Sequence, residues 1–225
     1  MQPVTPSNRL IWSKAQASEA IRAWRTLLDL RCPELLPQRS VLFQQGSVPR
    51  ALFLIEEGLV KLTHLCIHGD DLAMGLRFSG QVVECCSVIL RNVYDMSAMT
   101  TTNTSIHRVS FDRFVDAVVR KPEGALLLHR VLARDLSQTA EELISLRTDS
   151  AQLRFERLMH QLEALGFEVS PAYRNDPGSR TPMGLSNAEL ANLISVTPEH
   201  LSRIKHMAKF AAFAATSHRG DSDHR

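Results

Sequence analysis

The sequence contains no apolar run that approaches the roughly 18 to 20 residues needed by a membrane-spanning helix. Residues 1–20 also lack the basic start and the following apolar segment of a secretory signal peptide. Membrane insertion and export are therefore not indicated. We expect a cytoplasmic protein that has no membrane partner.

Cysteine and net charge are both scarce. Four cysteines in 225 residues do not make a disulfide framework, and a bond between the adjacent Cys85 and Cys86 would close a strained ring. Reduced thiols are therefore expected. The formal net charge is only +2, and affinity for phosphate depends on local clusters as much as on the total. Composition alone therefore does not indicate whether the chain binds nucleic acid.

The N-terminal part of the chain begins without a regular pattern. Residues 1–17 are polar and rich in proline and serine, which predicts a flexible arm. After this arm the apolar side chains Ile21, Trp24 and Leu27 recur at helical spacing, and Pro33 closes the segment. A short helix is therefore expected directly after the arm.

From Val41 the sequence pattern changes to short runs of β-favouring residues separated by glycine-containing turns, as in ALFLIEEG and RFSGQVV. This spacing predicts a compact antiparallel barrel or roll. Helical periodicity returns over residues 111–120, with Ser110 placed to cap that helix. Residues 18–121 are accordingly assigned to one sensing domain, and the fold class is expected to be α+β.

A long helix is predicted over residues 122–148, because this stretch lacks glycine and proline after its first turn. Its apolar positions are spaced 4, 3, 4 and 3 residues apart, a heptad seam that lets a helix pack along a copy of itself. The seam consists of Leu132, Leu136, Thr139, Leu143 and Leu146, extended backwards by His129 and Ala125. The alternative is that this stripe covers the barrel. Because the helix is longer than a small barrel needs, we favour a two-fold dimer.

The C-terminal part contains two short helical patterns with almost no connection between them. Ser186 and Glu189 form a capping-box pattern at the start of the first helix. Thr197 is placed to cap the second, and Pro198 occupies its first turn, where a missing N–H costs nothing. So short a turn forces the helices to cross steeply, which predicts a helix-turn-helix. The shared inner side would be formed by Leu190, Ala191, Leu193, Val196, Leu201 and Ile204.

The outward face of the second helix carries groups that can read base edges. Arg203 can donate to a guanine and Glu199 can accept from a cytosine amino group, each contact being worth roughly 1 to 3 kcal/mol of discrimination. The alternative is a surface ion pair worth a few tenths of a kcal/mol, but the short turn and the two caps favour DNA. The predicted DNA-binding residues are Thr197, Pro198, Glu199, His200, Ser202, Arg203 and Lys205. This domain is assigned to residues 149–211, and a disordered tail to 212–225.

With these features the chain resembles the CRP/FNR family of bacterial transcription regulators. The resemblance covers roughly residues 18–209 and is most specific in NAELANLISVTPEHLSRI, which aligns without gaps to the family's helix-turn-helix. It implies a cyclic-nucleotide-binding type of roll, a long dimerisation helix and a winged helix, with Glu199 and Arg203 reading a half-site commonly of the TGA type. The implied partners are double-stranded DNA with palindromic half-sites and a second copy of the chain, with RNA polymerase as a further candidate.

The residues that hold cyclic AMP in the family are not matched. Nucleotide-binding relatives carry a glutamate for the ribose and an arginine for the cyclic phosphate, where this sequence has Gln81 and Met96. A buried phosphate without a guanidinium partner is strongly unfavourable, so we expect an effector other than cyclic AMP. The pocket that the resemblance implies is lined by Gln81, Glu84, Cys85, Cys86, Met96, Ser97 and Thr139.

Three further family features are not matched. The N-terminal cysteine cluster that holds an iron–sulfur cluster in some members is missing, since only Cys32 lies near the start. After Phe210 the segment AAFAATSHRGDSDHR has no strand pattern, so the wing is expected to be degenerate and its phosphate contacts reduced. Ser195 stands in the turn where the family commonly has glycine.

Several chemistries are candidates for the sensed signal. His64, Cys66 and His68 alternate along a predicted strand and offer nitrogen and sulfur ligands to zinc or copper; the alternative is exposed polar residues beside a turn. Cys85 and Cys86 lie where the resemblance places the effector pocket, which makes haem ligation or thiol oxidation candidates there. The alternative is that both are buried, inert cysteines.

Taken together, these patterns predict a homodimeric, sequence-specific transcription regulator rather than an enzyme. Two alternatives stay open. One is a sensor and dimerisation module with lost or weak DNA binding, and the other is a cupin-like metal-binding protein built on the roll and its histidines. The effector, the target genes and the direction of regulation are not fixed by the sequence.

Overall fold

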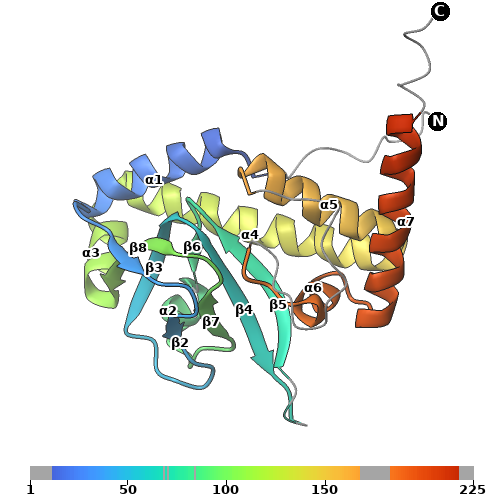
Figure 1. Cartoon of the computed structure of the whole chain (residues 1–225). Helices are drawn as coiled ribbons and strands as arrows, with labels where there is room; N and C mark the ends of the chain where they lie inside the picture. Colours follow the sequence, from blue (N-terminus) through green and yellow to red (C-terminus); the bar gives the residue numbers. More distant parts are fainter. Residues whose placement is uncertain (1–11, 68, 70, 84, 168–182, 218–225) are drawn as a thin grey trace, which may run out of the picture.

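The computed structural model consists of an N-terminal roll of strands flanked by helices and continued by a C-terminal group of helices (Figure 1). It describes residues 12–67, 69, 71–83, 85–167 and 183–217, with 208–217 described by their backbone alone. In chain order the elements are α1 (Lys14–Leu28), β1 (Glu34–Leu36), β2 (Val41–Phe43), β3 (Ala51–Glu57), β4 (Leu59–Leu65), β5 (Asp71–Phe78), β6 (Val82–Val83), α2 (Cys85–Leu90), β7 (Ser97–Thr100), β8 (Thr104–Ser110), α3 (Phe111–Arg120), α4 (Pro122–Thr148), α5 (Ala151–Ala164), α6 (Asn187–Leu193) and α7 (Pro198–Ser217).

The roll is built from two four-stranded sheets. One has the strand order β1-β8-β3-β6 and the other β2-β7-β4-β5, and the strand pairs in both are antiparallel. Aliphatic and aromatic side chains of both sheets fill the space between them, among them Leu52, Ile55, Leu62 and Ile106. The predicted roll and the α+β fold class are confirmed.

The N-terminal helix is longer than the sequence pattern indicated. It begins at Lys14, where Ser13 and Gln16 form a capping box, so the stretch from Trp12 to Ala17 is not part of a flexible arm. Residues 1–11 of that predicted arm lie outside the described residues. Trp12 is buried, and its indole N–H donates to the carbonyl of Ser79 at 2.6 Å. This contact fastens the start of α1 to the turn that follows β5.

Gly80 permits the close approach of α1 to that turn. Its φ is +83°, and an added Cβ would lie 2.7 Å from the backbone of Ala17. Any larger residue would have to adopt a left-handed backbone and push α1 away from the roll. The packing of the N-terminal helix therefore depends on this one glycine.

The helices that follow the strands of the roll lie where the sequence pattern predicted them, but one predicted cap and the end of the last helix differ. α4 has the bounds that were predicted for the long helix. Ser110 stands at the N-cap position of α3, but its hydroxyl makes no capping hydrogen bond. α7 runs to Ser217, so residues 212–217 are helical where a disordered tail was predicted. Along the described stretches of the chain, no helix combines the length and the apolar character that a membrane crossing requires.

Candidate nucleic-acid interface and effector site

α6 and α7 form the predicted helix-turn-helix. The hydroxyl of Ser186 accepts the N–H of Glu189 at 3.2 Å, and the carboxylate of Glu189 accepts the N–H of Ser186 at 2.6 Å, which confirms the capping box. At the start of α7 the hydroxyl of Thr197 accepts the N–H of His200 at 3.3 Å. The predicted inner side is buried or partly buried throughout, as seen for Leu190, Ala191, Leu193, Val196, Leu201 and Ile204.

The turn between the two helices is closed by Ser195. This residue has a φ of +53° and donates its N–H to the carbonyl of Asn192 at 2.9 Å. A left-handed backbone costs a residue with a Cβ roughly 1 to 2 kcal/mol, which is the physical reason why glycine suits this position. The chain keeps the tight turn despite the serine.

The exposed start of α7 presents the pair that was predicted to read bases. Pro198, Glu199, His200 and Arg203 are exposed and Ser202 is half-buried. The backbone N–H of Glu199 itself, then the hydroxyl of Thr197 and the charge of Arg203, hold the pKa of the Glu199 carboxyl below its usual value. Glu199 is therefore a charged acceptor at neutral pH.

Lys205 does not belong to this exposed face. Only 6% of it is accessible, and its Nζ donates to the side chain of Asn187 in α6 at 2.5 Å. Burial also lowers the pKa of Lys205. Its prediction as a DNA-contacting residue is corrected: in this structure the lysine fastens α7 to α6.

The helix-turn-helix is docked on the roll through a buried ion pair. Lys61 of β4, which is 6% exposed, bonds the carboxylate of Glu189 in α6. Burial by itself would raise the pKa of Glu189, but the bonds from Lys61 and from the N–H of Ser186 outweigh it, and the pKa lies below its usual value. The residue that caps α6 is thus also the residue that joins the two domains.

Apolar side chains continue the same contact. Leu59, Leu76 and Phe78 of the roll belong to one buried cluster with Met183 and Leu185, which precede α6. Between these two, an added Cβ on Gly184 would overlap the carbonyl oxygen of Thr101 and the side-chain amide of Gln38, so the chain lies directly on the roll there. The roll and the helix-turn-helix therefore share a core.

Sequence reasoning missed this docking contact, although one signal for it was present. Lys61 interrupts the apolar run LVKL in β4, and its neighbours Val60 and Leu62 are buried as well. A lysine in the middle of a fully buried strand requires a charged or hydrogen-bonding partner. The sequence alone did not say that this partner lies 128 residues further along the chain.

The long helix α4 exposes most of its predicted seam in the single chain. Leu136 is 72% exposed, and Leu143 and Leu146 are exposed as well. The first part of the helix behaves differently, because Leu132 and the neighbouring Val131 pack against the core of the roll. The first half of the stripe therefore covers the roll, as the alternative interpretation predicted. The second half is exposed in the single chain, and its role in a dimer stays a prediction.

The described residues of the predicted effector pocket differ in their burial and contacts. Gln81 is buried, and its side chain accepts the N–H of Phe78 at 2.8 Å. Cys85 is buried, Cys86 is exposed, and Met96 packs against the core of the roll. Two more residues are held by local bonds: Ser97 accepts the N–H of Gln45, and Thr139 donates to the carbonyl of Asp135 within α4. Glu84 lies outside the described residues.

The predicted metal ligands are tested only in part. The ring Nδ1 of His64 lies 3.1 Å from the carbonyl oxygen of Asp95, and Cys66 follows the end of β4. His68 lies outside the described residues. Among the residues that are described, no three histidine, cysteine or carboxylate side chains are grouped as a metal site would require.

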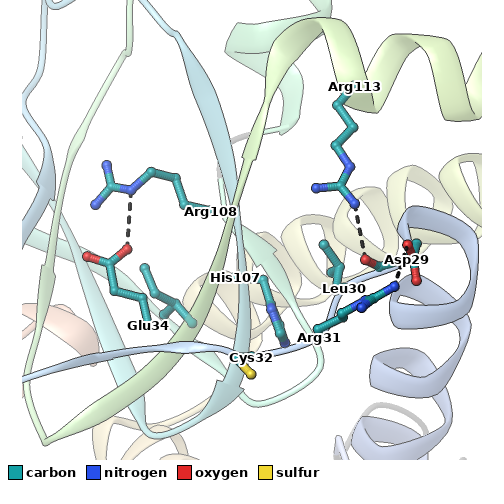
Figure 2. A pocket seen from close by; sticks show the side chains of 9 residues that line it. Asp29, Leu30, Arg31, Cys32, Glu34, His107, Arg108 and Arg113 are labelled. Carbon is teal, nitrogen blue, oxygen red and sulfur yellow. Dashed lines mark hydrogen bonds and ion pairs between the residues drawn. The ribbon is translucent and has the colours of Figure 1, made fainter.

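A hollow of about 490 Å³ lies on the outer side of the roll, between the end of α1, β8 and α3. Figure 2 shows its guanidinium groups and the sulfur of Cys32. Arg108 pairs with Glu34 at 3.3 Å, whereas Arg113 donates to backbone carbonyls, including that of Asp29 at 3.1 Å. Its basic groups thus serve mainly to hold the end of α1 and the strand edge in place.

Comparison with known proteins finds distant relatives in sequence. No family model matches the chain. The cyclic AMP receptor protein of Thermus thermophilus is 25% identical over 172 residues, which cover 76% of this chain and 74% of that protein. The transcriptional activator protein Anr of Pseudomonas protegens is 21% identical over 169 residues, covering 75% and 67%. Over about three quarters of its length the chain is thus similar in sequence to regulators of the CRP/FNR type.

Solved structures of CRP/FNR-type proteins share the fold of this chain. FixK2 from Bradyrhizobium japonicum matches with a TM-score of 0.65 and 14% identity, over 81% of this chain and 87% of that one. The c-di-GMP-responsive global regulator CLP of Xanthomonas campestris matches with a TM-score of 0.61 and 18% identity, over 87% and 93%. Both matches cover more than four fifths of this chain, so it shares the fold of these proteins.

Removing the docking cation is expected to weaken the fold. Lys61→Met leaves the carboxylate of Glu189 largely buried and without its partner, and should cost about 3 kcal/mol of unfolding free energy at pH 7. The pKa of Glu189 is lowered in the folded protein, so the stability that depends on its charge is present above its usual pKa of 4.5 and is lost as the pH falls through the lowered value. Urea unfolding of the wild type and of Lys61→Met measures this. The difference between their unfolding free energies should be smaller at pH 4 than at pH 7.

Glu189→Gln is the matched partner variant, because glutamine retains the capping-box acceptor. The double variant Lys61→Met with Glu189→Gln should be more stable than Lys61→Met alone, since it buries no unpaired charge. If the two substitutions change the unfolding free energy by strictly additive amounts, the side chains of Lys61 and Glu189 do not interact in solution.

Proposed function

We propose that this CRP/FNR protein is a homodimeric, sequence-specific DNA-binding regulator whose roll responds to an effector other than cyclic AMP. The observation that carries the proposal is the exposed start of α7, where Glu199 and Arg203 are one helical turn apart on a helix-turn-helix with both caps formed. A carboxylate and a guanidinium in this position can pair with cytosine and guanine edges in the major groove.

The docking of the helix-turn-helix supports this role. Lys61 and the buried apolar cluster contact α6 and the segment before it, whereas the base-reading side chains of α7 point away from that contact and remain exposed. In Figure 1, α7 stands at the edge of the molecule beside α4 and α5. The reading face is therefore free for a nucleic acid while the domain is held in place.

A second copy of the chain is the partner that the exposed half of α4 favours. Leu136, Leu143 and Leu146 follow a heptad spacing and are exposed, and two such stripes can cover each other along a two-fold axis. That symmetry would present two copies of α7 to successive major grooves, about 34 Å apart. The preferred duplex would then carry inverted half-sites.

The residues at the positions that the family uses for cyclic AMP support a different effector. Met96 replaces the phosphate-binding arginine and packs into the core of the roll, and Gln81 is occupied by the backbone of Phe78. Neither can neutralise a cyclic phosphate. An uncharged effector would not require that neutralisation.

A module that has lost DNA binding is the second candidate function. It is favoured by α7, which continues as a helix to Ser217 where relatives of the family turn into a wing. Without wing strands, the phosphate contacts would come from the helix-turn-helix alone. Selection from a random duplex pool separates the two candidates, because a module without DNA binding would enrich no sequence.

Arg203→Ala is expected to remove base discrimination. In gel-shift titrations against the selected duplex, the wild-type protein should prefer the correct base at the guanine contact by roughly 1 to 3 kcal/mol, and the variant should bind correct and altered duplexes alike. The variant should stay folded and dimeric, because Arg203 is exposed.

Arg120→Ala is the control for this experiment. Arg120 is an exposed arginine of α3 that pairs with Asp116 of the same helix, so its loss changes the net charge equally without touching α7. The Arg120→Ala variant should show the same base preference as the wild type. Unaltered discrimination by Arg203→Ala would refute the assigned role of this residue.

Leu136→Asp is expected to dissociate the dimer. Each copy would place a carboxylate in the seam in place of an apolar side chain worth about 1.5 to 3 kcal/mol when buried, so the dimer dissociation constant should rise by about 100-fold or more. Sedimentation equilibrium measures this directly. The control is Val119→Asp, at an equally exposed position on α3, which should change the dimer dissociation constant by no more than about threefold. If both variants raise this constant equally, α4 is not the interface.

A further inference from the structure

The side chain of Arg154 in α5 joins the end of the long helix α4 to the turn of the helix-turn-helix. Its Nη1 donates to the carbonyl oxygen of Asp149 at 2.7 Å, and its Nε donates to the carbonyl oxygen of Ile194 at 2.9 Å. Asp149 is the C-cap residue of α4, and Ile194 is the C-cap residue of α6. Because a guanidinium is a rigid plane, these two bonds fix the ends of the two helices relative to each other.

Asp149, the first of these two residues, is itself held from both sides. Its carboxylate accepts the hydroxyl of Ser145 in α4 at 2.6 Å and pairs with the guanidinium of Arg157 in α5 at 2.6 Å. The side chain of Asp149 is only 10% exposed, so solvent screens this ion pair less than it would a surface pair. The carbonyl that Arg154 uses is therefore a fixed point at the junction of α4 and α5.

Ile194, the second of the two residues, precedes the strained position of the turn. The peptide unit between Ile194 and Ser195 is planar, so the direction of the Ile194 carbonyl and the φ of Ser195 are set together. That φ is +53°, a value that is unfavourable for a residue with a Cβ. A rotation that relieved it would break the bond to Arg154. Because α7 begins shortly afterwards, at Pro198, this turn determines the direction of the recognition helix.

Apolar packing between α5 and α7 supplies adhesion but little direction. Phe155 of α5 belongs to the same buried cluster as Leu201 and Ile204 of α7. The hydrophobic effect is non-directional, so such a contact resists separation of the helices more strongly than a small rotation. Hydrogen bonds weaken steeply when donor and acceptor are misaligned. The two bonds of Arg154 therefore restrict the rotation that the apolar cluster allows.

We infer that Arg154 is a positioning residue, which sets the direction of α7 relative to α4 and thereby the half-site spacing that the dimer accepts. The inference rests on the proposed function, in which two copies of α4 form the dimer and two copies of α7 read the DNA. One added base pair moves a half-site by roughly 3.4 Å along the duplex and rotates it by about 35°. A firmly held α7 accepts one spacing, whereas a loosely held α7 accepts the neighbouring spacings as well.

Arg154→Met tests this role, because methionine keeps an unbranched stem and donates no hydrogen bond. Fluorescence anisotropy measures dissociation constants of the full-length protein for duplexes that carry the selected inverted site with its spacer one base pair longer or shorter. The wild type should prefer its best spacer by about tenfold or more, the factor expected of one hydrogen bond from a charged donor. In Arg154→Met this preference should fall to about threefold or less, while the base preference at the Arg203 contact is retained.

Arg157→Met is the matched control, because it removes a guanidinium from the same helix and from the same Asp149. Among the described residues Arg157 pairs with that carboxylate and not with the helix-turn-helix, so this variant should keep the spacer preference of the wild type. Arg154→Lys can donate to one of the two carbonyls but not to both, and its spacer preference should lie between those of the wild type and Arg154→Met. Circular dichroism and sedimentation verify that each variant is folded and dimeric, and Arg154→Lys carries the comparison if Arg154→Met is not.

Two results with DNA would overturn the inference. An Arg154→Met protein that binds every duplex more weakly but keeps its spacer preference would show that Arg154 only stabilises the domain. Equal loss of the preference in Arg157→Met would show that the α4–α5 junction as a whole sets the spacing. In either case the wild type still selects an inverted site, so the proposed function stands while the inference fails.

Hydrogen exchange tests the contact without DNA. The N–H of Val196 donates to the carbonyl of Ala191 at 3.0 Å and closes the turn. In Arg154→Met this N–H should exchange about tenfold faster or more, whereas the amides of β4 should exchange as in the wild type. Unchanged exchange of Val196 would overturn the inference. If the wild type selects no DNA sequence, the proposed function fails, and the exchange of Val196 still decides whether Arg154 holds the turn.

Discussion

The buried ion pair between Lys61 and Glu189 is the contact on which the arrangement of the molecule depends. A lysine in the middle of a buried strand is tolerated only with a charged partner, and that partner caps the first helix of the helix-turn-helix. The capping glutamate therefore couples two levels of structure, because the local start of α6 and the docking of a whole domain use the same carboxylate. The apolar cluster that contains Leu59 and Leu185 continues the same contact between the roll and the helix-turn-helix.

The remaining connections keep this unit attached to the long helix. Arg154 of α5 donates to the carbonyls of Asp149, at the end of α4, and of Ile194, in the helix-turn-helix turn. Gln161 of α5 exchanges two hydrogen bonds with the backbone of Trp12, which also contacts the turn after β5. α5 thus connects the start of α1 and the end of α4 to the turn of the helix-turn-helix.

The sequence could predict the features that depend on residues close together in the chain, such as helix bounds and helix caps. The lack of glycine and proline after the first turn indicated α4 with its observed bounds. The short turn between two capped helical patterns indicated the helix-turn-helix. It could not predict what depends on distant partners: Lys205 was listed among the DNA-binding residues, but its side chain bonds Asn187 of α6. The same limit applies to Trp24, whose helical spacing indicated an apolar position of α1, because only the folded structure shows that no described residue accepts its N–H.

Native-state hydrogen exchange tests most directly whether the roll and the helix-turn-helix are one packed unit. The slowest amides of β4 report opening of the roll, and the N–H of Leu190, which donates to the carbonyl of Ser186 inside α6, reports opening of the docked domain. A shared core predicts opening free energies that agree within about 1 kcal/mol. Opening of α6 at a free energy several kcal/mol lower than that of β4 would contradict it, because the domain would then leave the roll while the roll stays folded.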